Sequence, residues 1–147
     1  MYGLPVPRCY LLTVCVGSSL DQQSNNVSLF TLVEQISVRR DAQPASGLIP
    51  LEVHAYFEVG SVELPLAFEV RFLLVGPNGL ETYSDSIRLQ ASSPKIRTKT
   101  MGLPPPPVAG QHNLRVEWRQ EGGAWHREPV GWPIVLVELD ATPPVTH

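Results

Sequence analysis

Four histidines and two cysteines are the residues whose side chains could bind a metal ion or act as bases and nucleophiles. They are His54, His112, His126, His147, Cys9 and Cys15. No two histidines have a spacing that presents both from one element, and no Cys-x-x-Cys pair accompanies them. The sequence therefore contains no recognisable metal-binding motif.

His54 is the histidine with acidic neighbours, because it alternates with Glu52 and Glu58 along one segment. A histidine flanked by carboxylates can hold zinc or act as a base. The intervening residues are apolar, which places all three polar side chains on the solvent face of a predicted strand. We therefore expect this group to be solvated.

The motifs of common enzyme classes are missing from the sequence. There is no Gly-x-Ser-x-Gly nucleophile motif and no glycine-rich phosphate loop, and the carboxylates are scattered over several segments. Cys9 and Cys15 lie in an apolar segment that would not lower the pKa of a thiol. We predict a protein that is not an enzyme and that has no cofactor, with an enzyme of unrecognised site as the least favoured alternative.

The two cysteines also indicate a compartment. On one strand Cys9 and Cys15 would lie about 20 Å apart, whereas a disulfide requires Cα atoms within about 7 Å. Two buried, unpaired thiols are typical of a reducing cytoplasm, so we predict a cytoplasmic protein. No run of 18 apolar residues is present, so no membrane insertion is expected.

Lys95, Arg97 and Lys99 alternate in one short run and would share one face of a strand. Such a stripe of three positive charges could receive an acidic partner or a phosphate group. Charges on an edge strand also prevent edge-to-edge aggregation, and the proline-rich loop that follows favours an edge position. Both interpretations stay open, with edge protection favoured.

Prolines and tryptophans supply the other candidates for a partner-binding surface. Pro105 and Pro106 lie within a run of four prolines that cannot join a sheet and favours an extended conformation. Trp125 follows a glycine turn, and Trp132 follows Gly131. Both tryptophans could be partly exposed, at an interface or as a platform for a sugar ring, but the favoured interpretation is that each caps an end of the core; Trp118 is expected in the core.

Alternation of apolar and polar residues predicts the elements that position these side chains. It recurs in segments 51–59, 66–74 and 113–119, with turn residues between them. Segments 9–16 and 132–139 are apolar on both faces, which is typical of central strands. In segment 27–38, Glu34 interrupts the alternation, and a one-residue bulge near Glu34 or Gln35 would restore it.

Composition supports the same fold. The chain has 147 residues, 15 of them proline and 11 glycine, which disfavours helices. We predict a single domain spanning 1–147, with tails at 1–7 and 141–147. Its fold is an all-β, antiparallel β-sandwich, immunoglobulin-like or a related Greek key, with seven to nine strands and little or no helix. The net charge of −3 gives no basic face for nucleic acid.

The order of features resembles an uncharacterised family of small bacterial β-sandwich proteins. The likeness rests on the hydrophobic segment 9–14, the segment 27–36 after a polar loop, and the segments 110–116 and 133–137 after the prolines. The chain departs from the family at Gly17-Ser18-Ser19 and Asn25-Asn26, where the family has an acidic residue and Gly-Lys. The resemblance implies a β-sandwich, and the family has no established activity that could be carried over to this chain.

The function expected from the sequence is that of a non-enzymatic interaction module or structural protein. Its partner would be a protein, another chain or a second copy, bound through a sheet face, an edge or a loop. The alternative is a β-sandwich that binds a small molecule or carbohydrate through an exposed tryptophan.

Overall fold

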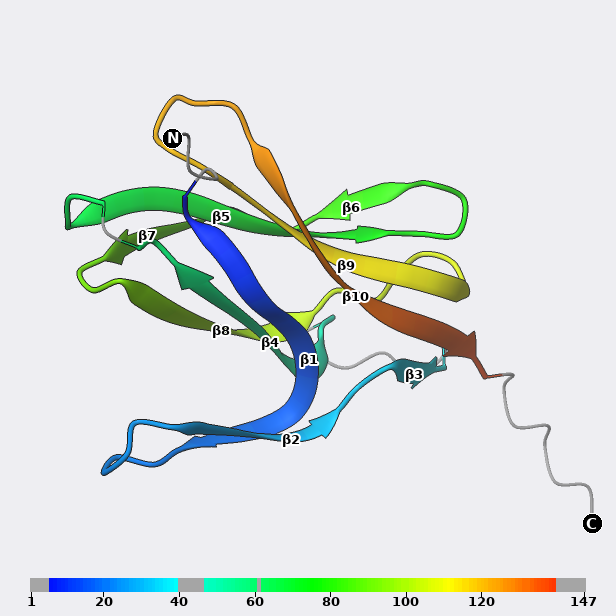
Figure 1. Ribbon diagram of the computed structural model, residues 1–147. Helices are drawn as coiled ribbons and strands as arrows, with labels where there is room; N and C mark the ends of the chain where they lie inside the picture. Colours follow the sequence, from blue (N-terminus) through cyan, green and yellow to red (C-terminus); the bar gives the residue numbers. More distant parts are fainter. Residues whose placement is uncertain (1–5, 40–46, 61, 140–147) are drawn as a thin grey trace, which may run out of the picture.

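The computed structural model describes residues 6–39, 47–60 and 62–139, which form two packed β-sheets (Figure 1). No helix occurs in these ranges, so the all-β prediction is confirmed, and nothing in them is a helix that could span a membrane. Of the predicted tail at 1–7, Pro7 is fully buried. Residues 1–5 and the tail at 141–147 lie outside the described part of the chain.

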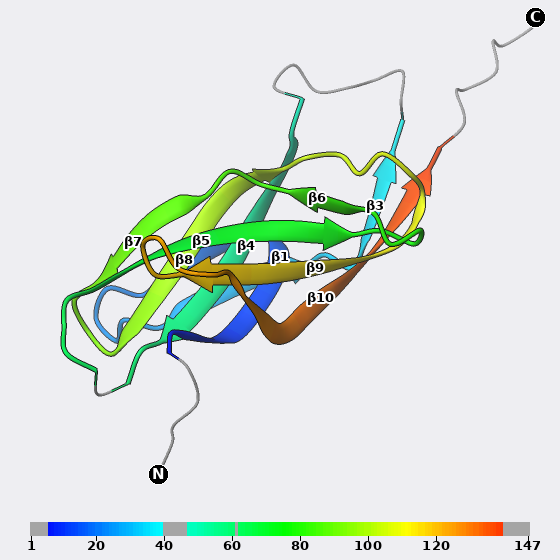
Figure 2. The same ribbon diagram turned by 90° about the horizontal axis from the view of Figure 1, so that it is seen from above.

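Ten strands make up the two sheets. They are β1 (Arg8–Leu20), β2 (Val27–Leu32), β3 (Gln35–Val38), β4 (Ile49–Glu58), β5 (Leu66–Val75), β6 (Glu81–Tyr83), β7 (Ile87–Ala91), β8 (Lys95–Leu103), β9 (Gly110–Arg119) and β10 (His126–Glu138). Sheet A has the order β2-β1-β4-β8. Sheet B has the order β3-β10-β9-β5-β6, and β7 also pairs with β5 (Figure 2).

The strand count exceeds the predicted seven to nine partly because the segment 27–38 divides. Instead of a bulge, the chain leaves sheet A after β2 and enters sheet B as β3, which pairs in parallel with β10. The Val33 N–H donates to the Val14 carbonyl in sheet A at 2.8 Å. The next residue, Glu34, accepts from the Val135 N–H in sheet B at 2.8 Å. The predicted bulge is therefore wrong, since the backbone hydrogen bonds pass from one sheet to the other between adjacent residues.

The core lies between the two sheets and is built from the predicted apolar faces. Val53, Phe57 and Phe68 are almost fully buried, and the rings of Phe57 and Phe68 meet edge-to-face at 5.7 Å across the sheets. Trp118 is 3% exposed and belongs to the same cluster, as predicted. One continuous core thus joins strands from both ends of the described chain.

The predicted positions of central and edge strands agree with the sheet order. β1 lies between β2 and β4, and β10 lies between β3 and β9. β8 pairs only with β4 among the described strands, so Lys95–Lys99 lies on an edge strand. A strand with apolar residues on both faces is typical of the centre of a sheet, where both faces of the strand are covered.

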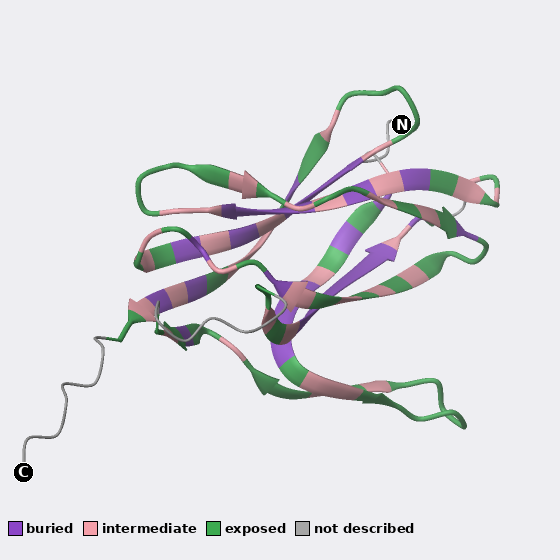
Figure 3. Ribbon diagram, turned by 180° about the vertical axis from the view of Figure 1, so that it is seen from behind, coloured by how far each residue is buried: buried purple, intermediate pink, exposed green. Residues whose placement is uncertain are grey.

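The second half of β1 and the whole of β2 form an arm, residues 16–32, that bends away from the sandwich and lies beneath the outer face of sheet A (Figures 1 and 3). Ser18 and Leu20 on the arm line one groove together with His54 and Lys99 on β4 and β8. The outer face of sheet A is therefore partly covered by the arm.

Candidate functional site

We call the part of the outer face of sheet A that the arm covers the covered face. Its members are Thr13 and Cys15 on β1 and Glu52, His54 and Tyr56 on β4. Strand register brings them together, because Cys15 is the partner of Glu52 and Thr13 is the partner of His54. All five residues are buried. Residues distant in the sequence thus form one polar cluster.

The expectation that His54 and Glu52 are solvated is wrong. His54 is 3% exposed and Glu52 is 8% exposed. Alternation correctly places both side chains outside the sandwich core, but β1 then bends and its continuation covers them. Glu58 lies apart from this cluster, paired with Arg8 at 2.6 Å at the surface.

Glu52 is the centre of the polar cluster. Its Oε1 accepts from the Ser18 hydroxyl at 2.7 Å, lies 2.8 Å from His54 Nε2 and lies 3.9 Å from Cys15 Sγ. The hydrogen bonds from His54 and Ser18 lower the pKa of Glu52 below its usual value. Burial, and then the negative charge of Glu52, raise the pKa of the Cys15 thiol. The cluster therefore combines a carboxylate, an imidazole and a thiol in a protected site.

The cationic stripe, defined as Lys95, Arg97 and Lys99, is exposed along β8 beside the covered face. Register places Arg97 next to Tyr56 and Lys99 next to His54. The Arg97 guanidinium lies 5.7 Å from the centre of the Tyr56 ring, and the Lys95 ammonium lies 5.5 Å from that of Tyr10. No described carboxylate forms an ion pair with these three cations.

Two hollows adjoin the cationic stripe. One, of about 210 Å³, lies between the arm and the β4–β8 surface and includes Ser18, His54, Arg97 and Lys99 in its walls. The other, of about 650 Å³, lies near the tip of the arm, between Asn25, Tyr10 and Lys95–Arg97. Lys99 borders the first hollow, Lys95 the second and Arg97 both, so each member of the stripe adjoins a hollow.

The predicted proline and tryptophan candidates are not gathered at this surface. Pro105 is half-buried and Pro106 is buried in the loop between β8 and β9. The Trp132 indole N–H donates to the Val33 carbonyl at 2.7 Å, where the chain crosses between the sheets. Trp125 is partly buried, with the guanidiniums of Arg71 and Arg119 at 4.1 and 4.4 Å from its ring. These contacts give both tryptophans a structural role.

Trp125 belongs to a network on the outer face of sheet B that the sequence did not reveal. Arg71 pairs with Glu117 at 2.8 Å, Arg127 pairs with both Glu117 and Glu81, and Arg119 pairs with Glu69. The signal in the sequence is the alternation of opposite charges at every second residue in β5 and β9. Arg71, Arg119 and Arg127 on this face are each paired with a glutamate, in contrast to the cationic stripe.

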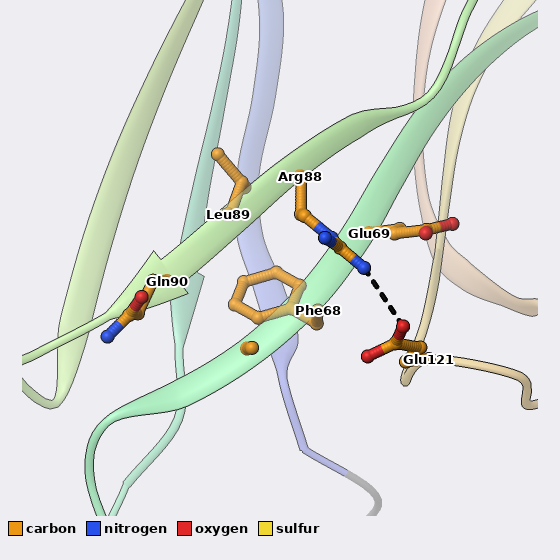
Figure 4. Close-up of a pocket in the computed structure, with 7 residues that line it drawn as sticks. Phe68, Glu69, Arg88, Leu89, Gln90 and Glu121 are labelled. Atoms are coloured by element: carbon orange, nitrogen blue, oxygen red, sulfur yellow. Dashed lines mark hydrogen bonds and ion pairs between the residues drawn. The ribbon is translucent and has the colours of Figure 1, made fainter.

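A further hollow, of about 360 Å³, lies on sheet B beside β5 and β7 (Figure 4). Figure 4 shows Arg88 and Glu121 pointing toward each other, and their ion pair measures 3.1 Å. Glu69, also in the wall, is paired with Arg119. Since its charged residues already neutralise one another, this hollow offers no free charge for a ligand.

Comparison of the sequence with protein-family models and with curated proteins found no match in either case. The likeness to the bacterial β-sandwich family therefore stays a prediction. The covered face and the cationic stripe are the features that support a function.

Proposed function

We propose that this protein is a non-enzymatic binding module whose β8 edge receives an extended, acidic segment of a partner protein. The observation that carries the proposal is the cationic stripe, three exposed cations on the edge strand of sheet A that form no ion pair with a carboxylate in the described part of the chain. By contrast, Arg8, Arg71, Arg88, Arg119 and Arg127 all pair with glutamates.

An edge strand supplies main-chain hydrogen-bonding groups for an added strand. Alternate residues of a strand are about 6.6 Å apart on one face, at roughly 3.3 Å per residue. Lys95, Arg97 and Lys99 have this spacing, and so would carboxylates at every second position of an added strand. The peptide backbone would therefore pair with β8 while its acidic side chains meet the stripe.

Protection against aggregation explains charges on an edge, but it requires no hollow beside them. Here the stripe borders two hollows, and Tyr10 and Tyr56 lie under its cations. The hollows provide room for side chains of the partner, and the ring faces hold the cations toward solvent. Both features support binding over protection alone.

The test is binding of a fluorescent peptide that contains Glu-Val-Glu-Val-Glu, measured by anisotropy. We expect binding that weakens with salt and falls tenfold or more in the double variant Lys95→Gln/Arg97→Gln. The matched control is Arg39→Gln/Arg88→Gln, which removes two exposed charges elsewhere and should bind as the wild type does. Equal loss in both double variants would show nonspecific attraction and contradict the proposal.

A second peptide separates strand addition from charge attraction. A version of Glu-Val-Glu-Val-Glu with every backbone amide N-methylated has the same charge but no backbone N–H groups, so it cannot donate main-chain hydrogen bonds to β8. We expect it to bind at least tenfold more weakly. Equal affinity for the two peptides would rule out strand addition.

Two further parts of this proposal are an immunoglobulin-like or related Greek-key topology, which the sheet arrangement supports, and a cytoplasmic location, which the cysteines support. The chain passes from sheet A to sheet B after β2, after β4 and after β8, and repeated passages between sheets are typical of immunoglobulin-like and Greek-key sandwiches. Cys9 and Cys15 are both buried and free, which favours a reducing compartment such as the cytoplasm.

A further inference from the structure

We propose that Cys15, Glu52 and His54 bind a zinc ion. One ligand atom from each residue, a sulfur, a carboxylate oxygen and a ring nitrogen, lies within 4.8 Å of the other two. All three residues are buried, and they come from β1 and β4, whose pairing fixes their positions. This inference goes beyond peptide binding and does not depend on it.

The donor set selects the metal. Zinc accepts thiolate, imidazole and carboxylate ligands in tetrahedral sites, whereas magnesium and calcium require oxygen ligands. Ligands at about 2.0–2.3 Å from zinc lie roughly 3.3–3.8 Å from one another in such a site. The distance from Glu52 Oε1 to Cys15 Sγ is 3.9 Å and that to His54 Nε2 is 2.8 Å, so small side-chain rotations would produce this geometry.

Charge and protons balance in the bound state. Zinc binding would displace the proton of the Cys15 thiol to solvent, and the thiolate together with the Glu52 carboxylate would offset the two charges of the ion. His54 donates its Nε2–H to Glu52 in the metal-free protein, so ligation through Nε2 would require the neutral ring to change tautomer, with the proton leaving Nε2 and Nδ1 taking one up. No electron is transferred and no other reactant is needed.

The surroundings of His54 give an independent sign of an incomplete site. His54 Nδ1 is fully buried and has no hydrogen-bond partner in the described structure, and the same is true of the Thr13 hydroxyl. Thr13 is the residue opposite His54 in the strand pair. A metal on Nε2 fixes the proton on Nδ1, and a metal-bound histidine ordinarily donates that N–H to a neighbouring oxygen. Thr13 is the facing residue, and a side-chain rotation would be needed to bring its hydroxyl into hydrogen-bond distance of Nδ1.

Access and a fourth ligand come from the arm. Ser18 and His54 both line the hollow of about 210 Å³, which provides a path for the ion. The Ser18 hydroxyl is 2.7 Å from Glu52 Oε1, so it or a water molecule could complete a tetrahedron. The site would then have three protein ligands that are strong and one position that exchanges.

The experiment uses Co²⁺ as a spectroscopic probe of the metal-free, reduced full chain. We expect one equivalent of Co²⁺ to produce the near-ultraviolet thiolate-to-metal charge-transfer band and intense visible bands of tetrahedral cobalt. One equivalent of Zn²⁺ should abolish both. Absence of the charge-transfer band in the folded wild type would overturn the proposal, leaving Cys15, Glu52 and His54 as a hydrogen-bonded cluster.

The chain offers a matched control in its second buried thiol. Cys15→Ser should weaken Zn²⁺ binding, measured calorimetrically, by tenfold or more, whereas Cys9→Ser should leave it unchanged. Equal weakening by the two variants would overturn the proposal. If Cys15→Ser does not fold, the wild type decides: one equivalent of Zn²⁺ should raise its melting temperature, and should not raise that of His54→Gln. A wild-type melting temperature that zinc leaves unchanged would count against the site.

Discussion

Glu52 accepts hydrogen bonds from Ser18 on the arm and from His54 on its own strand, in a place that solvent barely reaches. A buried carboxylate is stable only when such partners replace water. The arm is therefore held to sheet A by a charge-assisted hydrogen bond as well as by packing. Loss of the Glu52 charge should weaken that attachment.

Low pH should weaken the attachment of the arm to sheet A, because it protonates the Glu52 carboxylate. The pKa of folded Glu52 lies below its ordinary value of 4.5, so the carboxylate stabilises the fold above that pH. The contribution is lost as pH falls through 4.5 and then through the folded pKa. We expect the difference in unfolding free energy between wild type and Glu52→Gln to be constant near neutrality and to shrink below about pH 4.5.

Urea denaturation at several pH values measures this difference. Asp21 and Glu81 also have lowered pKa values, but both are unchanged in the variant, so their effects cancel in the difference. A difference that stays constant down to pH 3 would show that folding does not depend on the charge of Glu52.

The Thr13 hydroxyl is a second residue-level test of the covered face. It is buried and has no partner in the described structure, and such a group costs about 1–3 kcal/mol. In metal-free protein, Thr13→Val should therefore raise the free energy of unfolding by about 1 kcal/mol. The matched control is Thr98→Val, which removes a 2.8 Å hydrogen bond to the Ala55 carbonyl and should lower it by about 1 kcal/mol. A destabilised Thr13→Val would mean that the hydroxyl has a partner after all, such as a bound water.

At the scale of elements, the arm carries an unusual backbone. Thr31 in β2 has φ of 57°, a left-handed value that β-branched residues rarely adopt and that costs about 1–3 kcal/mol. Its side chain is exposed, so little packing is lost on truncation. The arm therefore stores strain beside the cluster that it covers.

Thr31→Gly should relieve this strain. Glycine adopts positive φ freely but loses about 0.5–1 kcal/mol more chain entropy, so we expect a net gain in unfolding free energy of up to about 2 kcal/mol. Thr31→Ala keeps the Cβ atom at the strained position and should show no such gain. Thermal unfolding of the three proteins makes the comparison, and equal melting temperatures for Gly and Ala would contradict it.

The alternation of β4, β5 and β9 predicted which side chains enter the core, because packing between two sheets requires one apolar face per strand. It did not predict that His54 and Glu52 are buried, because a period of two does not report the bend of β1 or what covers an outer face. The edge position of Lys95–Lys99 was predictable from charge and the following prolines. The meeting of Cys15 with Glu52 was not, since it depends on the β1–β4 register.

At the scale of the whole molecule, the Trp132 side chain links β10 of sheet B to the segment at which the chain crosses between the two sheets. Trp132→Phe removes the hydrogen bond to the Val33 carbonyl, and we expect a loss of about 1 kcal/mol of stability. Amide exchange should accelerate most in β3, which follows Val33. Trp125→Phe, on the opposite side of sheet B from the core, is the control and should leave exchange in β3 unchanged.

The parallel pairing of β3 with β10 also constrains the order of folding during synthesis. The ribosome releases β3 long before it releases β10, and β3 has no other strand partner in the described chain. The N-terminal strands of sheet A can pair early, but this edge of sheet B must wait for the last strand. A nascent chain stalled before His126 would thus expose the edge of β9 and the apolar side of β3, and it is at this stage that a chaperone would have most to protect.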